Sequence, residues 1–199
     1  MKKKDSILII GNGESILNYN LGIEIDKYAI IGRINNYKLK GFKEKIGSKT
    51  DIWINGANSK LERKNIYPDK ILVFIPSEIL TKKQKYLDGY VSNRLKLDEN
   101  KFKVISLNTI KNFEEKIKHH RLTTGLYSIL WAIENYNEVI IHGFDFFINS
   151  KSHYYNSKIT SIINEYFLKK GSKHDNTKEK NFVEKMIENK KIKRLTDIQ

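Results

Sequence analysis

The stretch of sequence that decides the fold lies near the start of the chain and reads Ser6-Ile7-Leu8-Ile9-Ile10-Gly11-Asn12-Gly13. A continuous apolar run that ends in glycine is typical of a strand buried on both faces of a parallel sheet. Further runs rich in β-branched residues predict strands at 28–31, 51–54, 70–75, 103–107 and 138–142. Helical patterns predict helices at 108–119, 124–136 and 176–191. Strands alternating with helices predict an α/β fold: one Rossmann-like domain with a largely parallel twisted sheet flanked by helices.

The composition limits what kind of protein this chain can be. Its 199 residues are expected to form a single domain, 1–199, that ends in a basic helical segment from about residue 157. The absence of cysteine excludes disulfides, thiol catalysis and thiolate zinc sites. Apolar runs are far shorter than the ~20 residues of a membrane-spanning helix, and no apolar segment follows the lysines at 2–4. We therefore expect a soluble, cytoplasmic protein.

The net charge is strongly positive. The chain has 37 Lys and Arg residues against 23 Asp and Glu residues, which gives 37 − 23 = +14. Such a surface favours anionic partners, namely a nucleotide sugar, an anionic lipid surface or nucleic acid. The composition does not choose among these three classes.

Ligands of parallel α/β sheets bind outside the carboxyl ends of the strands. The residues that follow the predicted strands are Gly11-Asn12-Gly13, Arg33-Ile34-Asn35, Asn55-Gly56 and His142-Gly143-Phe144. Gly-Asn-Gly is similar to a dinucleotide-binding loop, but Ile16 stands where the third glycine is needed, and the second strand ends in Asn35 rather than an acidic residue. These differences argue against NAD. A mononucleotide-binding loop remains one interpretation of the pattern, because glycine lets backbone amides approach an anion. An ordinary turn with two glycines is the other interpretation.

The start of the helix predicted from residue 124 is another candidate binding feature. Thr123 or Thr124 is a natural N-cap, and the free amides and positive dipole end of a helix also bind carboxylate or phosphate. Gly125 costs about 1 kcal/mol inside a helix. That cost is easier to explain if a ligand has to come close to the backbone there.

Two histidines lie in polar stretches late in the chain. His153 precedes Tyr154 and Tyr155, whose rings either pack in the interior or contact a base or sugar. His174 precedes the last predicted helix, for which Asn176 is the expected N-cap, with Glu179 in the first turn. At the positive end of that helix His174 is expected to stay neutral near pH 7 and so to be able to act as a general base.

Taken in order, these segments resemble the sialyl motifs of glycosyltransferase family 29. Residues 9–13, 21–28, 33–35 and 41–50 are similar to the large motif, and residues 123–125 through 137–144 to the small motif. His153-Tyr154-Tyr155 is similar to the third motif, and His174 with Glu179 to the very small H-x-x-x-x-E motif. The resemblance implies a GT-A-like sialyltransferase fold in a short, bacterial-type member.

The resemblance also implies a reaction. Sialic acid would move from CMP-sialic acid to a hydroxyl of a glycan acceptor, with inversion and without a metal or other cofactor. His174 would be the general base, and His153 would stabilise the departing phosphate. Asn12 and Asn35 would hydrogen-bond the CMP phosphate and ribose. The full expected donor-binding set is Gly11, Asn12, Gly13, Asn35, Thr123, Thr124, Gly125, Gly143 and Phe144, with support from Arg33, Tyr154, Tyr155 and Glu179.

Several alternatives stay open at this point. The motifs do not separate CMP-sialic acid from CMP-Kdo. Leu122 stands where the family usually has proline, and the family's eukaryotic disulfide has no counterpart. No Asp-x-Asp metal motif is evident, since Asp145 lacks a second acid. The expected acceptor is a surface polysaccharide or lipooligosaccharide, including a lipid-linked one, with peripheral contact to an anionic inner membrane face. A noncatalytic nucleotide- or nucleic-acid-binding module is the rival, although no RNA-binding aromatic motif is present.

Overall fold

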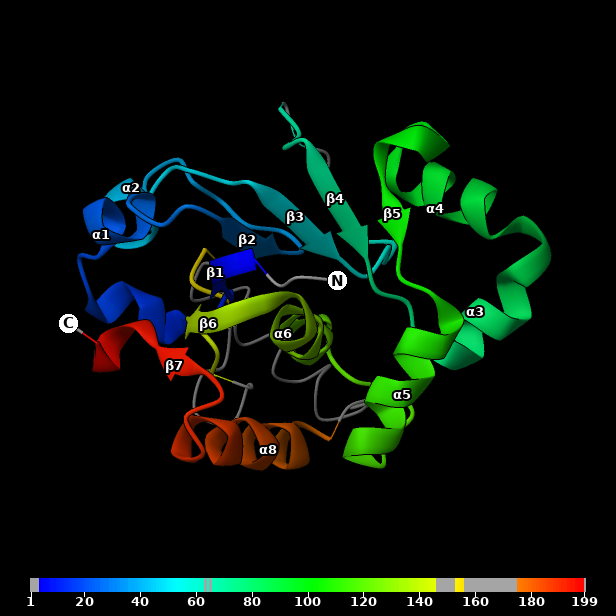
Figure 1. Cartoon of the computed structure of the whole chain (residues 1–199). Helices are drawn as coiled ribbons and strands as arrows, with labels where there is room; N and C mark the ends of the chain where they lie inside the picture. Colours follow the sequence, from blue (N-terminus) through cyan, green and yellow to red (C-terminus); the bar gives the residue numbers. More distant parts are fainter. Residues whose placement is uncertain (1–3, 63, 65, 146–152, 156–174, 199) are drawn as a thin grey trace, which may run out of the picture.

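A parallel sheet forms the centre of this computed structural model, which describes residues 4–62, 64, 66–145, 153–155 and 175–198 (Figure 1). Within these residues the sheet has seven strands in the order β5-β4-β3-β2-β1-β6-β7, and every neighbouring pair is parallel. The strands are β1 (Lys4–Ile10), β2 (Ile31–Ile34), β3 (Ile52–Asn55), β4 (Lys70–Val73), β5 (Lys103–Val104), β6 (Tyr136–His142) and β7 (Lys193–Arg194). The prediction of an α/β fold with a parallel sheet is confirmed.

Helices cover both faces of this sheet. The α-helices of the described residues are α1 (Gly22–Asp26), α2 (Lys43–Ile46), α3 (Ser77–Lys83), α4 (Leu87–Leu95), α5 (Leu107–Ile117), α6 (Thr124–Asn135) and α8 (Asn176–Glu188). The described residues also form the short 3₁₀ turns η1 (Glu14–Asn18), η2 (Gln84–Tyr86), η3 (Glu99–Lys101) and η4 (Leu195–Asp197). The side chains of β1 alternate between the two faces: Ile7 and Ile9 pack with α5, α6 and α8, whereas Leu8 and Ile10 pack with η1, α1 and α2. Burial on both sides explains why β1 reads as an unbroken apolar run.

Several boundaries differ from the predictions by one to three residues, and three differences have a clear physical cause. The second strand begins at Ile31 rather than residue 28, because the turn that ends α1 extends to Tyr28, whose amide bonds the Ile25 carbonyl at 3.1 Å. The strand at 103 is only two residues long, because Ser106 caps α5 directly after it. The helical prediction to the end of the chain is wrong after α8: β7 follows and pairs with Ile140 and Ile141 of β6. Two residues are too few to show a strand period. Residues 157–174 lie outside the described part.

The strand order reverses at β1. Strands β2 to β5 lie on one side of it, and β6 and β7 lie on the other. The loops after β1 and β6 therefore leave the same edge of the sheet side by side, with the Gly11 amide bonded to the His142 carbonyl at 2.8 Å. Such a switch point is where open α/β sheets bind ligands. Within the described residues, no helix combines the length and apolarity that crossing a membrane requires.

Candidate functional site

A cavity of about 110 Å³ lies at this switch point, outside the carboxyl ends of β1, β2 and β6. All nine expected donor-binding residues and His153 line it. The complete lining is Gly11, Asn12, Gly13, Ile34, Asn35, Thr123, Thr124, Gly125, Gly143, Phe144, Asp145 and His153. We call this space the switch-point cavity. Segments that lie more than 100 residues apart in the chain thus meet around one small volume.

The two glycines after β1 are required by close packing as well as by any ligand. A Cβ atom at Gly11 would lie 2.3 Å from the Gly143 carbonyl oxygen, and one at Gly13 would lie 2.4 Å from the carboxyl carbon of Asp145. Gly143 itself has φ +71°, a conformation that L side chains rarely adopt. The Gly-Asn-Gly pattern therefore permits contact between the loops after β1 and β6. This explains the pattern without a dinucleotide.

Asn35 is held in a left-handed conformation, with φ 48°. Its amide donates to the Ile54 carbonyl at 2.7 Å, and its carbonyl accepts from the Trp53 indole at 2.8 Å. Its side-chain Oδ1 accepts from the Gly56 amide at 3.2 Å. Asparagine tolerates positive φ better than most residues do. Because Oδ1 is already used, Nδ2 is the group left to donate a hydrogen bond into the cavity.

Asn12 has the opposite orientation. Its Nδ2 donates to the Ile34 carbonyl at 2.8 Å, which fixes the amide. Its Oδ1 is buried and has no hydrogen-bond partner among the described residues. A buried acceptor without a donor costs free energy, so this oxygen is suited to a hydroxyl or amino group of a ligand. Asn12 and Asn35 together present one acceptor and one donor.

The start of α6 forms another wall. Thr123 is the N-cap, and its hydroxyl accepts from the Leu126 amide at 3.2 Å. The same hydroxyl donates to Glu179 Oε2 at 2.5 Å, and the Thr123 amide donates to Oε1 at 2.7 Å. The Thr123 hydroxyl proton is therefore already committed. The amides of Thr124 and Gly125, in the first turn, have no partner within the helix and are the donors available at its positive end.

His153 is placed beside the cavity by backbone contacts. It forms an antiparallel bridge with Gly13, and the next amide, that of Tyr154, donates to the Asn12 carbonyl at 3.1 Å. Its ring stacks on that of Tyr155, with ring centroids 5.3 Å apart. Burial lowers the pKa of His153 below its usual value, while hydrogen bonding to the Asn12 backbone acts in the opposite direction. The neutral imidazole is the favoured form.

The expected supporting residues lie behind the cavity rather than on its wall. Tyr154 is buried, and its hydroxyl both donates to the Lys38 carbonyl at 2.9 Å and accepts from the Lys38 amide at 2.8 Å. Arg33 is fully buried, and its guanidinium donates to the Ile46 and Lys49 carbonyls. Burial lowers the pKa of Arg33 to about 10. These side chains fix the backbone around the cavity. Of the two expectations for Tyr154, interior packing is the one observed.

Glu179 connects α8 to α6. Burial raises its pKa to about 7, the two hydrogen bonds from Thr123 lower it, and the Asp175 charge raises it.

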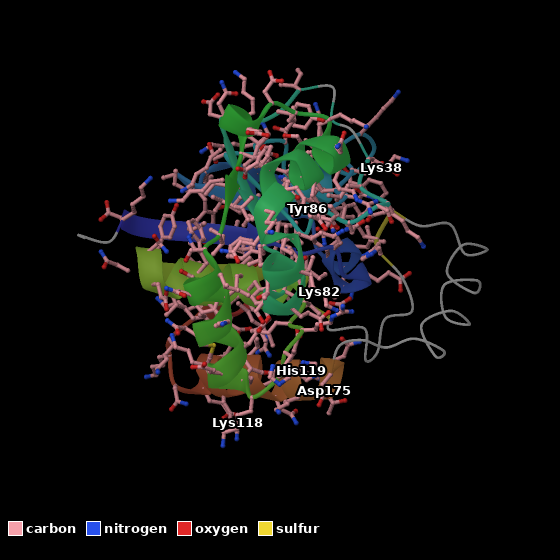
Figure 2. All side chains as sticks on the ribbon, turned by 90° about the vertical axis from the view of Figure 1, so that its right-hand side faces the viewer. Lys38, Lys82, Tyr86, Lys118, His119 and Asp175 are labelled. Atoms are coloured by element: carbon pink, nitrogen blue, oxygen red, sulfur yellow. The ribbon has the colours of Figure 1, made fainter. Side chains whose placement is uncertain are left out.

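The N-cap of α8 is Asp175, which accepts from the Lys178 amide at 2.9 Å, so the prediction of Asn176 as cap is wrong by one residue. Figure 2 shows Asp175 and His119 toward the same end of the molecule. His174, the expected base, lies outside the described residues.

Two residues at strand ends received no role in the donor-binding prediction. Asp145 lines the switch-point cavity and accepts from the Ser15 amide at 2.9 Å. Its position directly after Gly143-Phe144, at the end of a strand, is the sequence signal that points to it. Asn55, which the sequence analysis names only as a residue after a strand, lies at the end of β3 and is fully buried, and its Nδ2 has no hydrogen-bond partner in the described part of the chain. Among the described residues, no group of three or more His, Asp or Glu side chains could hold a metal ion.

Comparison with known proteins identifies the family. A family model described as "Glycosyltransferase family 29 (sialyltransferase)" matches residues 3–191. The chain belongs to glycosyltransferase family 29. The resemblance inferred from the four motifs is thereby confirmed.

Named relatives are similar over nearly the whole chain. The type 2 lactosamine alpha-2,3-sialyltransferase of Rattus norvegicus is 27% identical over 218 residues, which cover 95% of this chain and 64% of the relative. A human CMP-N-acetylneuraminate-beta-1,4-galactoside alpha-2,3-sialyltransferase is 24% identical over 220 residues, which cover 96% of this chain and 56% of the relative. The chain thus spans less than two thirds of the length of these relatives.

The fold has a solved counterpart. A mammalian sialyltransferase in complex with Gal-beta-1-3GalNAc-ortho-nitrophenol superposes with a TM-score of 0.72 at 18% identity, covering 96% of this chain and 69% of that one. At this identity the likeness concerns the fold.

Proposed function

We propose that this chain is an inverting, metal-independent sialyltransferase that moves sialic acid from CMP-sialic acid to a hydroxyl group of a glycan acceptor. Membership of family 29 and the names of the relatives support the reaction class. The observation that carries the proposal is the convergence of all nine expected donor-binding residues and His153 on the switch-point cavity.

The polar groups of this cavity match a nucleoside monophosphate. The phosphate would sit at the start of α6, where the Thr124 and Gly125 amides and the helix dipole favour an anion. The Asn35 Nδ2 donor suits a phosphate oxygen as well. The Asn12 Oδ1 acceptor does not suit a phosphate, because both would be acceptors, so we assign it to a ribose hydroxyl.

The reaction can proceed with these groups. The acceptor oxygen attacks the anomeric carbon and forms the new C–O bond, while the bond from that carbon to the phosphate oxygen breaks and its electron pair leaves with CMP. His174 takes the proton of the acceptor hydroxyl. The helix end and an N–H of neutral His153 stabilise the charge that develops on the phosphate. None of these steps requires a metal ion.

The donor cannot lie wholly within the switch-point cavity. Pockets for drug-sized ligands measure about 300–1,000 Å³, whereas this one measures about 110 Å³. We therefore assign to it the ribose and phosphate, and we place the base and the sialyl group at its mouth.

The decisive experiment is incubation of the purified chain with CMP-sialic acid, and separately with CMP-Kdo, over a panel of glycan acceptors, with CMP release as the signal. The panel should include type 2 lactosamine and Gal-beta-1-3GalNAc-ortho-nitrophenol. We expect transfer from CMP-sialic acid, and no transfer by His174→Ala, which should still bind CMP. Preference for CMP-Kdo would replace the donor assignment. Failure to bind CMP, together with nucleic-acid binding that weakens steeply with salt, would favour the noncatalytic module.

We further propose that the enzyme works on the cytoplasmic side of an anionic membrane, where its +14 charge would hold it near a lipid-linked acceptor such as a lipooligosaccharide or polysaccharide precursor. Co-sedimentation with liposomes should rise with the fraction of anionic lipid. Sedimentation that does not change with lipid charge would remove the membrane from this proposal.

A further inference from the structure

A second and much larger cavity, of about 680 Å³, adjoins the switch-point cavity. Both share residues 143–145, which form the wall between them. The larger one lies outside the ends of β6 and β7 and is also lined by η1 and α8. We call it the β7-side cavity. Its volume lies in the range of pockets that hold whole small ligands.

The charges of the β7-side cavity do not suit an anion. Its lining holds two cationic residues, Lys180 and Arg194, and three acidic ones, Glu14, Asp145 and Glu184, a balance of 2 − 3 = −1 in a chain of net charge +14. Arg194 is ion-paired with Glu184. On so basic a protein, a pocket without cationic excess selects against phosphate and carboxylate groups.

The buried polar group of the β7-side cavity is the neutral imidazole of His142. His142 is only 5% exposed, and its Nε2 has no hydrogen-bond partner among the described residues. Burial lowers the pKa of His142 to about 4, although the Asp145 charge acts in the opposite direction. The imidazole is therefore uncharged at neutral pH. A ligand hydroxyl would satisfy Nε2 and offset the cost of burying it.

An aromatic ring stands next to this group. Tyr19 is 43% exposed, lines the cavity and meets the His142 ring edge to face, with centroids 6.2 Å apart. An exposed ring beside carboxylates, a lysine and a neutral imidazole offers both an apolar face and many hydrogen-bond partners. That combination suits an uncharged polyhydroxyl ligand, which has C–H faces and hydroxyl edges.

We infer that the β7-side cavity binds uncharged sugar residues of the acceptor glycan, with Tyr19 and His142 as the recognition pair. The inference rests on the proposed function, which places the donor on the other side of residues 143–145. A glycan in this cavity can present its reacting hydroxyl across that wall. The donor is excluded here because its phosphate and carboxylate are anions.

The test compares two exposed tyrosines. Tyr19→Ala removes the ring from the cavity, and Tyr86→Ala removes a ring of similar exposure, 55%, from η2, which does not line the cavity. Calorimetric binding of CMP and of the best glycan from an array would be measured for both variants and for the wild type. We expect Tyr19→Ala to weaken glycan binding at least fivefold and to leave CMP binding unchanged, and Tyr86→Ala to change neither.

A second pair lies on α8. Glu184→Gln alters a residue of the cavity, and Glu188→Gln alters an exposed glutamate one turn later. Only Glu184→Gln should raise the KM for the acceptor.

The inference is overturned if Tyr19→Ala weakens CMP binding instead of glycan binding, if it weakens neither, or if the wild type binds CMP but no glycan on the array. A wild-type chain that binds no CMP contradicts the proposed function itself, which separates the two failures.

Discussion

The starts of α6 and α8 are alike in design and differ in surroundings. Both helices are capped by a side-chain oxygen that accepts an amide of the first turn, from Thr123 in α6 and from Asp175 in α8. At α6 the cap is half-buried, and Glu179 of α8 binds both its amide and its hydroxyl. At α8 the cap is exposed. The positive end of α6, which faces the candidate donor site, is therefore completed by the last helix of the chain.

The candidate site depends on packing between segments that are far apart in sequence. Thr123 and Glu179 are 56 residues apart in sequence, and Lys178, next to Glu179, also donates to the Lys118 carbonyl just after α5 at 2.9 Å. Figure 2 shows Lys118 and Asp175 at the same end of the molecule. The α6 cap should thus contribute far more to stability than the α8 cap, and its contribution should depend on pH.

The largest effect is expected for Thr123→Val. The change keeps the shape of the side chain but removes the N-cap and leaves the buried Glu179 without its hydroxyl donor. Loss of a cap costs about 1–2 kcal/mol, and an unsatisfied buried acceptor costs about 1–3 kcal/mol. We expect a loss of about 3 kcal/mol in the free energy of unfolding, measured by urea denaturation at pH 7. Thr124→Val is the control; equal losses in the two variants would contradict the assigned cap.

The next effect concerns pH. Because burial raises the pKa of Glu179 to about 7, above its ordinary 4.5, the folded state favours the protonated acid. The stabilisation that comes from the raised pKa of Glu179 is complete below about pH 4.5 and is lost as the pH rises through about 7. Relative to Glu179→Gln, we expect wild-type stability to fall by about 2 kcal/mol between pH 5 and pH 8, as each pKa unit is worth about 1.4 kcal/mol. Denaturation curves at both pH values measure this. Glu188→Gln should follow the wild type, and a constant difference between wild type and Glu179→Gln would refute the assignment.

Much of this arrangement could be predicted from local sequence. The buried strands were visible as apolar runs, and the rule that parallel α/β sheets bind ligands outside the carboxyl ends of their strands pointed to the residues after β1, β2 and β6. The reversal of strand order at β1 was not predicted, because it depends on how the strands pair. Asn35 could be recognised because it follows a strand. Its role as a donor could not, since the orientation of its amide depends on Gly56, 21 residues away.

What the sequence could not supply comes from tertiary contacts. The Asn176 prediction was wrong because Asp175 and Asn176 are equally good caps by residue type, and only the backbone decides between them. Strand β7 was missed because two residues, Lys193 and Arg194, carry no periodic pattern and are held by pairing with β6. The neutral state of His142 follows from burial at a strand end rather than from its neighbours in sequence.

A smaller effect is expected at the second position of α6. Gly125→Ala gains up to about 1 kcal/mol of helix propensity, but the new Cβ would lie 3.1 Å from the Phe144 ring and beside the free amides. We expect nearly unchanged stability and a tenfold weaker CMP affinity by calorimetry, about 1.4 kcal/mol. Gly89→Ala in α4 is the control, because in the described part of the chain nothing beyond its own chain neighbours and helix backbone lies within 4 Å of its Cβ position. It should raise stability without changing CMP affinity. Unchanged CMP affinity in Gly125→Ala would show that the ligand does not approach this backbone.

The smallest effect is expected at the exposed cap. Asp175→Ala removes the acceptor of the Lys178 amide and should cost about 0.5–1 kcal/mol, near the lower end for caps because solvent can replace the carboxylate. It also removes the nearby negative charge that raises the pKa of Glu179, so the fall in stability with rising pH should move to lower pH. Asn176→Ala, one residue inside the helix, should do neither. If Asn176→Ala were the more costly of the two, the cap would lie at Asn176 after all. If Asp175→Ala cost as much as Thr123→Val, burial would not be what separates the two helix starts.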